Sequence, residues 1–282
     1  MSSFYSLSKY WLSIVISALL FIAINSSNAN AVEFRGDFIQ GSLVIGQLKQ
    51  GQTVEYAGKK LKRTEDGFFL LGFGRDALPT AELIITDTKG VSEVLVLQVA
   101  AREYNIQKIE GVPQKTVTPA AEDLHRIKQD ALSVKKARKL VSDQADFLGG
   151  FTNPNLGPVT GVYGSQRFYN GVPKSPHYGV DYAAPTGTIV KAPAAGIITF
   201  AHPDLFYSGG TLILDHGHGL SSSFLHLSEI LVADGQKIKS GDPIAKVGAT
   251  GRATGPHLDW RMNWLDQRVD PQLVLKALPL TR

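Results

Sequence analysis

The residues able to bind a metal ion or to transfer a proton gather in one stretch of the chain, from His177 to Asp259. His177 and Asp181 lie in the string H-Y-G-V-D, which is short enough for one turn or strand to bring an imidazole and a carboxylate together. His257 and Asp259 are two residues apart, a spacing that puts both side chains on one face of an extended strand. His226 lies between these pairs, after an apolar alternating run. Three segments from separate strands could therefore converge on one ion.

The composition limits which ligands such a site can use. The chain of 282 residues has no cysteine, which excludes thiolate zinc ligands, a cysteine nucleophile and disulfides. A catalytic zinc ion takes three protein ligands from His, Asp or Glu and keeps an open position for water. Histidine and carboxylate side chains must therefore hold any metal, and this stretch supplies them.

The overall composition is that of an ordinary globular chain. With 43% hydrophobic and 19% charged residues, we expect one or two domains with a substantial core. The formal net charge is +4 and the basic residues are scattered, so the sequence gives no reason to expect a nucleic-acid partner.

Residues 1–31 have the pattern of a secretory signal peptide. Lys9 gives a positive start, an apolar run extends from Trp11 to Ile24, and small residues precede the expected cleavage site. The run of about 14 residues is short of the roughly 20 that span a bilayer, which makes an uncleaved anchor the weaker alternative. We predict that the mature chain begins at Val32, has no stable membrane span, and is periplasmic or secreted.

The spacing of apolar residues predicts a mainly β chain in three parts. Residues 32–101 alternate apolar and polar in short runs broken by glycine-centred turns, which is typical of a small immunoglobulin-like β-sandwich. Residues 102–150 have the pattern of an extended linker followed by a connecting helix. Residues 151–282 return to short strands and many turns, which predicts a second all-β domain.

Helical signals occur at two places in this β-rich pattern. Apolar residues recur at helical spacing from Pro119 to about residue 147, with Thr118 as the expected N-cap. Asp270 and Pro271 then open a last short helix or turn.

The remaining histidines lack the setting of a second metal site. His216 and His218 have ligand-like spacing, but the glycines around them indicate a hairpin turn with positive φ angles. His125 lies on the predicted helix with no second ligand one turn away, so we interpret it as a surface or packing residue. His202 precedes a proline and is interpreted as a loop residue.

The three motifs resemble those of the lysostaphin-type zinc metallopeptidases, the LytM-like peptidoglycan endopeptidases. That family has H-x-x-x-D, then a histidine in a string such as Y-A-H-L-S, then G-P-H-x-H. This chain has H-Y-G-V-D from His177, F-L-H-L-S around His226 and G-P-H-L-D around His257. The resemblance extends from about Val159 to Val274. It implies a LytM-like β-sheet peptidase fold and a zinc-dependent endopeptidase that cuts peptide stems or cross-links of cell-wall peptidoglycan.

Carried over position by position, the resemblance implies that His177, Asp181 and Asp259 bind Zn²⁺. It implies that His226 and His257 are the unligated catalytic pair, and which of the two accepts or donates the proton stays open. One position departs from the family, because Asp259 stands where a histidine ligand is usual. Aspartate also binds zinc, at about 2.0–2.2 Å, so coordination can survive the change. Two carboxylates cancel the charge of the ion, so we expect a working but slower site.

This departure keeps a second hypothesis open, which is a non-catalytic LytM-like protein that binds peptidoglycan or activates a partner wall amidase. Whether Asp259 holds a metal discriminates between the two hypotheses. A third interpretation comes from residues 234–244, which resemble the turns of biotinyl and lipoyl carrier domains. The absence of a methionine beside the lysines there, together with the expected export, disfavours a carrier.

Overall fold

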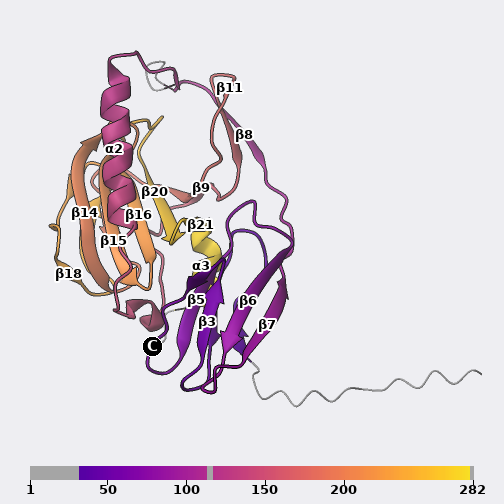
Figure 1. Ribbon diagram of the computed structural model, residues 1–282. Coiled ribbons are helices and arrows are strands. Elements are labelled where there is room, and N and C mark those ends of the chain that lie inside the picture. Colours follow the sequence, from indigo (N-terminus) through magenta and orange to yellow (C-terminus); the bar gives the residue numbers. More distant parts are fainter. Residues whose placement is uncertain (1–31, 113–116, 280–282) are drawn as a thin grey trace, which may run out of the picture. The chain divides into compact units, whose positions relative to one another are not determined.

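The computed structural model describes residues 32–112 and 117–279 of the chain (Figure 1). The predicted signal peptide lies outside the described residues. Strands account for far more of the described residues than helices do, which confirms the predicted mainly β class. None of the helices in the described ranges has the length and apolar character needed to cross a bilayer.

One eight-stranded sheet supports the residues predicted to do chemistry. Its strands follow the order β18-β14-β15-β16-β20-β12-β9, and β21 pairs with β20. β15 and β16 are buried at every position, so this sheet is covered on both faces. The strands are β9 (Val159–Gly161), β12 (Val180–Ala183), β14 (Gly196–Leu205), β15 (Gly209–Gly217), β16 (Leu220–Leu227), β18 (Lys237–Ile238), β20 (His257–Trp264) and β21 (Gln267–Val269).

The register between β12 and β20 decides which side chains meet. Antiparallel pairing places Asp181 directly opposite Asp259. On the other face of the same strands, Val180 pairs with the fully buried Trp260. Because a slip of one residue would turn every side chain to the opposite face, burial of this apolar face also fixes the two carboxylates on theirs.

Two smaller sheets complete the C-terminal half. One has the order β13-β19-β17 and the other β11-β10-β8. β8 belongs to the segment predicted as an extended linker, and it pairs in parallel with β10. The bounds are β8 (Ile106–Ile109), β10 (Gln166–Tyr169), β11 (Val172–Pro173), β13 (Ile189–Lys191), β17 (Glu229–Ile230) and β19 (Pro243–Lys246).

The N-terminal part consists of two small antiparallel sheets, with orders β1-β2-β5 and β4-β3-β6-β7. Apolar residues of both sheets, including Leu43, Phe69 and Leu83, are fully buried in the same core cluster. The immunoglobulin-like topology and the domain boundaries stay predictions. The strands are β1 (Glu33–Arg35), β2 (Leu43–Gln47), β3 (Thr53–Tyr56), β4 (Lys59–Lys60), β5 (Phe68–Gly72), β6 (Thr80–Thr86) and β7 (Ser92–Gln98).

The N-terminal sheets pack directly on the C-terminal half. A Cβ atom at Gly72 would lie 2.8 Å from the ring of Trp264, so only glycine allows this approach. Arg102 forms an ion pair of 2.7 Å with the buried carboxylate of Asp270. The described residues, 32–112 and 117–279, therefore belong to one compact unit.

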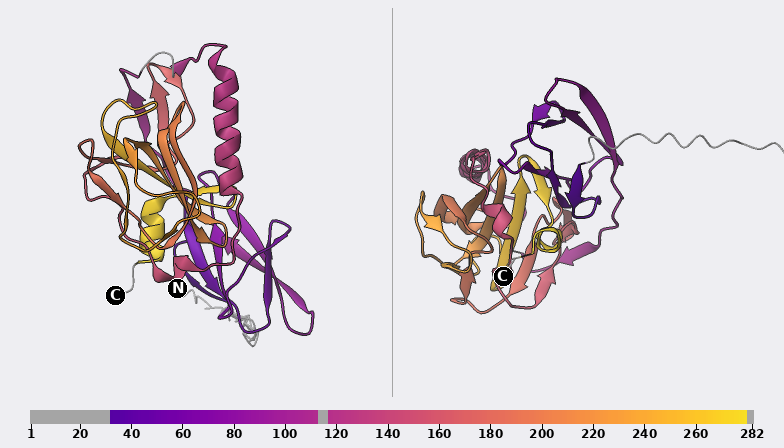
Figure 2. Two further views of the ribbon diagram at one scale, coloured as in Figure 1. Left: turned by 90° about the vertical axis from the view of Figure 1, so that its left-hand side faces the viewer. Right: turned by 90° about the horizontal axis from the view of Figure 1, so that it is seen from below.

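The long helix α2 (Asp123–Arg138) begins later than its sequence pattern predicts. Thr118 is not its N-cap, because the chain first forms turns in which Asp123 N donates to Ala120 O. No residue of α2 is buried as a whole, although the helix lies beside β14 and β15 (Figures 1 and 2). At its C-terminal end Arg138 is partly buried, and its Nε atom is shielded from solvent. Polar contacts hold the helix there: Arg126 pairs with Asp204 at 2.7 Å.

Two short helical segments complete the chain, namely the 3-10 turn η1 (Asp146–Gly149) and the helix α3 (Pro271–Ala277). The side chain of Asp270 caps α3 by accepting a hydrogen bond of 2.9 Å from Gln272 N. This confirms the helix predicted from Asp270 and Pro271.

Candidate metal centre and catalytic cleft

Three buried side chains meet on one face of the central sheet. His177, Asp181 and Asp259 each offer a ligand atom, and these atoms all lie within 4.8 Å of one another. His177 Nε2 is 3.0 Å from Asp181 Oδ1 and 3.5 Å from Asp259 Oδ1. Ligands held about 2.0–2.2 Å from a tetrahedral zinc ion lie about 3.4 Å apart, so the observed spacing fits such an ion.

The bonding of these atoms also fits a cation. Both ring nitrogens of His177 and Oδ1 of Asp181 are buried without a hydrogen-bond partner in the described chain. Buried polar atoms are almost always bonded, so these atoms need a partner from outside the chain. Of these atoms, His177 Nε2 and Asp181 Oδ1 lie 3.0 Å apart, as two ligands of one ion do. One imidazole and two carboxylates are ligands that suit zinc at such a point.

The backbone holds His177 in place just before β12. Its N–H donates to Ser165 O at 2.8 Å, and its carbonyl accepts from Gly164 N at 2.7 Å. Its imidazole is buried on the metal-facing side. These bonds anchor the one ligand that does not come from a regular strand.

Each carboxylate has its own arginine. Arg167 Nη2 lies 2.5 Å from Asp181 Oδ2, and Arg261 Nη2 lies 2.5 Å from Asp259 Oδ2. Arg261 Nε also donates to both oxygens of Asp259, at 3.0 and 3.1 Å. The sequence analysis missed both residues. Arg261 could have been found, since it follows Asp259 by two positions along a strand, whereas Arg167 lies on β10, which carries no clear strand signal.

These ion pairs change the expected charge of the centre. Burial alone would raise the pKa of Asp259, but Arg261 and then His177 hold it well below its usual range. Burial likewise opposes ionisation of Asp181, yet the net effect of His177 and Arg167 lowers its pKa. The two guanidinium groups match the two carboxylates in charge. The extra negative charge expected from Asp259 is therefore offset within the protein.

His226 and His257 face each other beside the three ligand candidates, with ring centres 4.8 Å apart. Nδ1 of His226 lies 2.8 Å from Thr250 O, and Nδ1 of His257 lies 2.8 Å from Gly255 O. A carbonyl only accepts hydrogen bonds, so in its neutral form each ring would carry the proton on Nδ1 and the lone pair on Nε2. Both rings thus present a proton acceptor.

The conformation and burial of His226 are unusual for a non-glycine residue. Its backbone has φ of +63°, in the left-handed region, and its N–H donates to Ser208 O at 2.8 Å. Such strained residues concentrate at functional sites. Burial lowers the pKa of the His226 imidazole to about 4, so the ring is neutral at pH 7.

A cleft of about 900 Å³ opens over these residues. His177, Asp181, His226 and His257 line it together with several cationic side chains. Arg252 is held in its wall between two aromatic rings, 4.9 Å from the ring centre of Tyr169 and 4.4 Å from that of Tyr207. The other cations of the lining are Lys108, Arg167, Lys174, Arg261 and Arg268. This cleft suits an anionic or strongly polar substrate.

The sequence of residues 175–271 matches the model of Peptidase family M23, and this range contains the three ligand candidates and both cleft histidines. The chain contains an M23 peptidase domain. The sequence-based resemblance to LytM-like peptidases is therefore confirmed.

Two relatives of the M23 domain are peptidases by name, and the name of the second specifies peptidoglycan. The DD-carboxypeptidase/endopeptidase Mpg of Neisseria meningitidis is 43% identical over 103 residues, which is 36% of this chain and 23% of the relative. The peptidoglycan DD-endopeptidase ShyA of Vibrio cholerae is 41% identical over 90 residues, which is 31% of this chain and 20% of the relative. The chain thus matches these relatives over a quarter of their length or less.

One solved structure matches beyond the M23 domain. The crystal structure of a proposed M23 peptidase from Pseudomonas aeruginosa is 29% identical, with a TM-score of 0.65. The match covers 86% of this chain and 96% of the other. The covered 86% is a longer part of the chain than residues 151–282. The shared fold therefore includes part of the chain that precedes the M23 domain.

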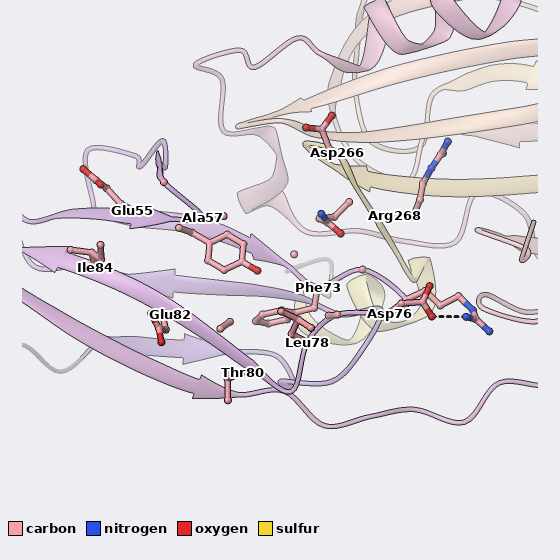
Figure 3. Close-up of a pocket in the computed structure, with 18 of the residues that line it drawn as sticks. Glu55, Ala57, Phe73, Asp76, Leu78, Thr80, Glu82, Ile84, Asp266 and Arg268 are labelled. Atoms are coloured by element: carbon pink, nitrogen blue, oxygen red, sulfur yellow. Dashed lines mark hydrogen bonds and ion pairs between the residues drawn. The ribbon is translucent and has the colours of Figure 1, made fainter. Parts of the chain in front are cut away.

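A second hollow, of about 790 Å³, lies between the N-terminal strands and the β20–β21 turn (Figure 3). Carboxylates of Glu55, Glu82 and Asp266 line it, and Asp76 pairs with Arg75 at 2.6 Å. It contains no histidine. Among the described residues no group of metal-ligating side chains lines this hollow, although Tyr178 and Arg268 line both it and the cleft over the candidate metal centre.

Histidines outside the cleft have structural settings. Both ring nitrogens of His216 are bonded, Nδ1 to Ala195 O at 2.7 Å and Nε2 to Ser222 Oγ at 2.8 Å. His218 lies in the β15–β16 turn with φ of +50°, which confirms the predicted hairpin. His125 is exposed on α2.

Proposed function

We propose that this protein is a zinc-dependent endopeptidase that hydrolyses peptide bonds in the stems or cross-links of cell-wall peptidoglycan. The observation that carries the proposal is the convergence of His177, Asp181 and Asp259 beside the His226 and His257 pair. All of these residues except the buried Asp259 line the same cleft. The names of the related M23 peptidases support the substrate class. The predicted signal peptide supports export to the compartment that holds this substrate.

The proposed zinc ligands are His177 Nε2, one inner oxygen of Asp181 and one of Asp259. When bound there, zinc would polarise the scissile carbonyl and lower the pKa of a water molecule to about 7. Arg167 bonds the outer oxygen of Asp181, and Arg261 bonds both oxygens of Asp259, so the two arginines fix the orientation of the carboxylates. The arginines thereby act as positioning residues.

His226 and His257 are the proposed proton carriers. Each presents the lone pair of Nε2, so either ring can accept a proton from the attacking water. The ring that takes the proton becomes a donor, which can protonate the leaving amine or stabilise the tetrahedral oxyanion. Because the two rings are adjacent, both functions fit within one cleft.

The test is digestion of purified peptidoglycan, with the fragments identified by mass spectrometry. We expect cross-linked or stem-peptide fragments to be shortened at a peptide bond, with the glycan strands intact. His257→Gln should keep its metal and lose cleavage, whereas His125→Gln, which alters an exposed histidine of α2, should cleave as the wild type does. Intact peptides with the metal-loaded wild type would contradict the proposal.

A second candidate function is a non-catalytic protein that binds peptidoglycan or activates a partner wall amidase. One observation favours it, namely that Arg261 already contacts both oxygens of Asp259, the position where the family usually has a histidine ligand. Peptidoglycan that co-sediments with the protein but is not cut, even with zinc supplied, would support this candidate.

A further inference from the structure

A separate cavity of about 420 Å³ lies where β4, the C-terminal end of α2, the β15–β16 turn and the β20–β21 turn come together. Its lining is strongly cationic, with one carboxylate, Asp266, among five basic side chains. Leu70, Val141 and Trp264 form an apolar wall. The basic side chains are Lys59, Lys60, Lys62, Arg138 and Lys139. None of these residues belongs to the proposed catalytic machinery.

Two buried nitrogens of this lining have no hydrogen-bond partner. They are Nε of Arg138 and Nδ1 of His218. His218 as a whole is only 5% exposed. Within residues 32–112 and 117–279, Arg138 also makes no ion pair with a carboxylate. A buried guanidinium does not escape this situation by losing its proton at neutral pH, so it requires an anion.

The charges around Arg138 also favour an anion in the cavity. Burial, with repulsion from Arg268 and Arg261, lowers the pKa of the Arg138 guanidinium to about 8. Burial also lowers the pKa of His218, so its ring is neutral at pH 7, and a hydrogen bond to the backbone of Asp143 already uses its one N–H. An oxyanion in the cavity would supply the acceptor that Arg138 lacks.

The nearby carboxylates do not meet this need. Asp143 pairs with Lys62, and Asp266 lies 3.7 Å from Lys59 with both side chains largely exposed. Lys60 and Lys139 have no carboxylate partner within the described ranges. Three cations around one cavity therefore remain to be matched.

We propose that this cavity binds a phosphate-bearing ligand with at least two negative charges. A phosphoryl group offers several strong acceptor oxygens on one centre, which suits a guanidinium and two ammonium groups better than a single carboxylate does. The sugar or lipid to which the phosphate is attached would rest on the wall formed by Leu70, Val141 and Trp264. Both a soluble phosphorylated sugar and a lipid headgroup share this chemistry.

Binding would connect parts of the chain that are far apart in sequence. Lys60 comes from the N-terminal sheets, Arg138 from the end of α2 and His218 from the M23 domain. A ligand that contacts all three should stabilise the folded protein, because it binds the native state and not the unfolded one.

The experiment measures thermal unfolding of the purified protein with pyrophosphate and with sodium chloride at equal ionic strength. We expect a saturable rise of the midpoint with pyrophosphate only. Arg138→Met should raise the midpoint without ligand, because it removes an uncompensated buried charge, and should abolish the response to pyrophosphate. Lys136→Met is the matched control, since Lys136 lies on the same helix turn, is exposed and does not line the cavity.

A second variant keeps the test decisive if Arg138→Met does not fold. Lys60→Gln combined with Lys139→Gln changes two exposed side chains and should weaken pyrophosphate binding at least tenfold in calorimetry. Sedimentation with vesicles of phosphatidylglycerol, against phosphatidylcholine alone, then identifies a lipid source if the wild type co-sediments and the double variant does not. Equal midpoints in the two salts, or an unchanged response in Arg138→Met, would overturn the proposal.

Discussion

The β15–β16 hairpin carries a buried histidine near each end, and the two differ in what their ring nitrogens touch. His216, near the turn, has hydrogen bonds at both nitrogens. His226, at the far end, has its Nδ1 bonded to a backbone carbonyl and lines the cleft beside His257. Burial lowers the pKa of both to about 4. Burial and pKa alone therefore do not separate a structural histidine from a chemical one, whereas the bonding of the second nitrogen does.

The largest expected effect comes from removing a proposed zinc ligand at the cleft end. Asp259→Ala should lose the metal and reduce peptidoglycan cleavage to the level without enzyme, because two ligands do not hold a catalytic zinc ion. His216→Gln, at the other end, should keep the full metal content. Metal analysis of the two purified variants measures their zinc content. A metal-loaded Asp259→Ala protein would contradict the role of Asp259 as a ligand.

Removal of a cleft histidine should affect the chemistry while the metal stays. We expect His226→Gln and His257→Gln to lower kcat by about 10²–10⁴, the range of general acid–base catalysis. In the same assay His216→Gln should leave kcat unchanged once the folded fraction is corrected for. Similar losses of kcat in all three variants would show that the cleft pair has no special role.

The Asp259–Arg261 pair predicts a large stability effect at the metal centre. Asp259→Asn keeps the shape but leaves the partly exposed Arg261 guanidinium without the counter-charge of the buried Asp259, which should cost about 1.5–3 kcal/mol of unfolding free energy. Asp266→Asn is the control, because its ion pair with Lys59 is exposed and should contribute less than about 1 kcal/mol. Denaturant unfolding of the metal-free proteins gives both values.

The pH dependence of the unfolding free energy tests the structural role of His216. The pKa of His216 is about 4 in the folded protein, below the unfolded value of about 6.5, so between these values the unfolded chain binds the extra proton. Stability from the neutral ring is thus present above pH 6.5 and is lost as the pH falls toward 4. Between pH 7 and 5 the wild type should lose about 2 kcal/mol more than His216→Gln does. If the unfolding free energies of the wild type and of His216→Gln changed with pH in parallel, the neutral, buried state of His216 would be contradicted.

The sequence predicted the β-rich class and the set of residues at the candidate centre, because those residues sit in compact motifs with glycine and proline around them. That Asp181 and Asp259 lie opposite each other could be predicted only through the family resemblance, because it depends on the register of β12 against β20. Arg167 could not be found, because it reaches Asp181 from β10, whose partner β8 lies far back in the presumed linker. Pairing between strands that are far apart in the sequence leaves no pattern among neighbouring residues from which it could be predicted.

The start of α2 shows a different limit. Proline after threonine is a good helix-start signal, yet the chain makes turns at residues 120–122 and the helix begins at Asp123. The expected N-cap therefore gave the wrong boundary. Leu124 and Leu132 are 56% and 51% exposed, so apolar periodicity there does not mark a buried face either.

The most direct test of the central claim is zinc K-edge X-ray absorption on the protein loaded with one equivalent of zinc. The account predicts a first shell with one imidazole nitrogen, from His177, and oxygen donors for the remaining positions at about 2.0–2.2 Å. Asp259→Ala should lose this signal, and His226→Gln should leave it unchanged. Two or more imidazoles in the first shell, or no specific zinc site, would contradict the assignment of His177, Asp181 and Asp259 as the metal centre.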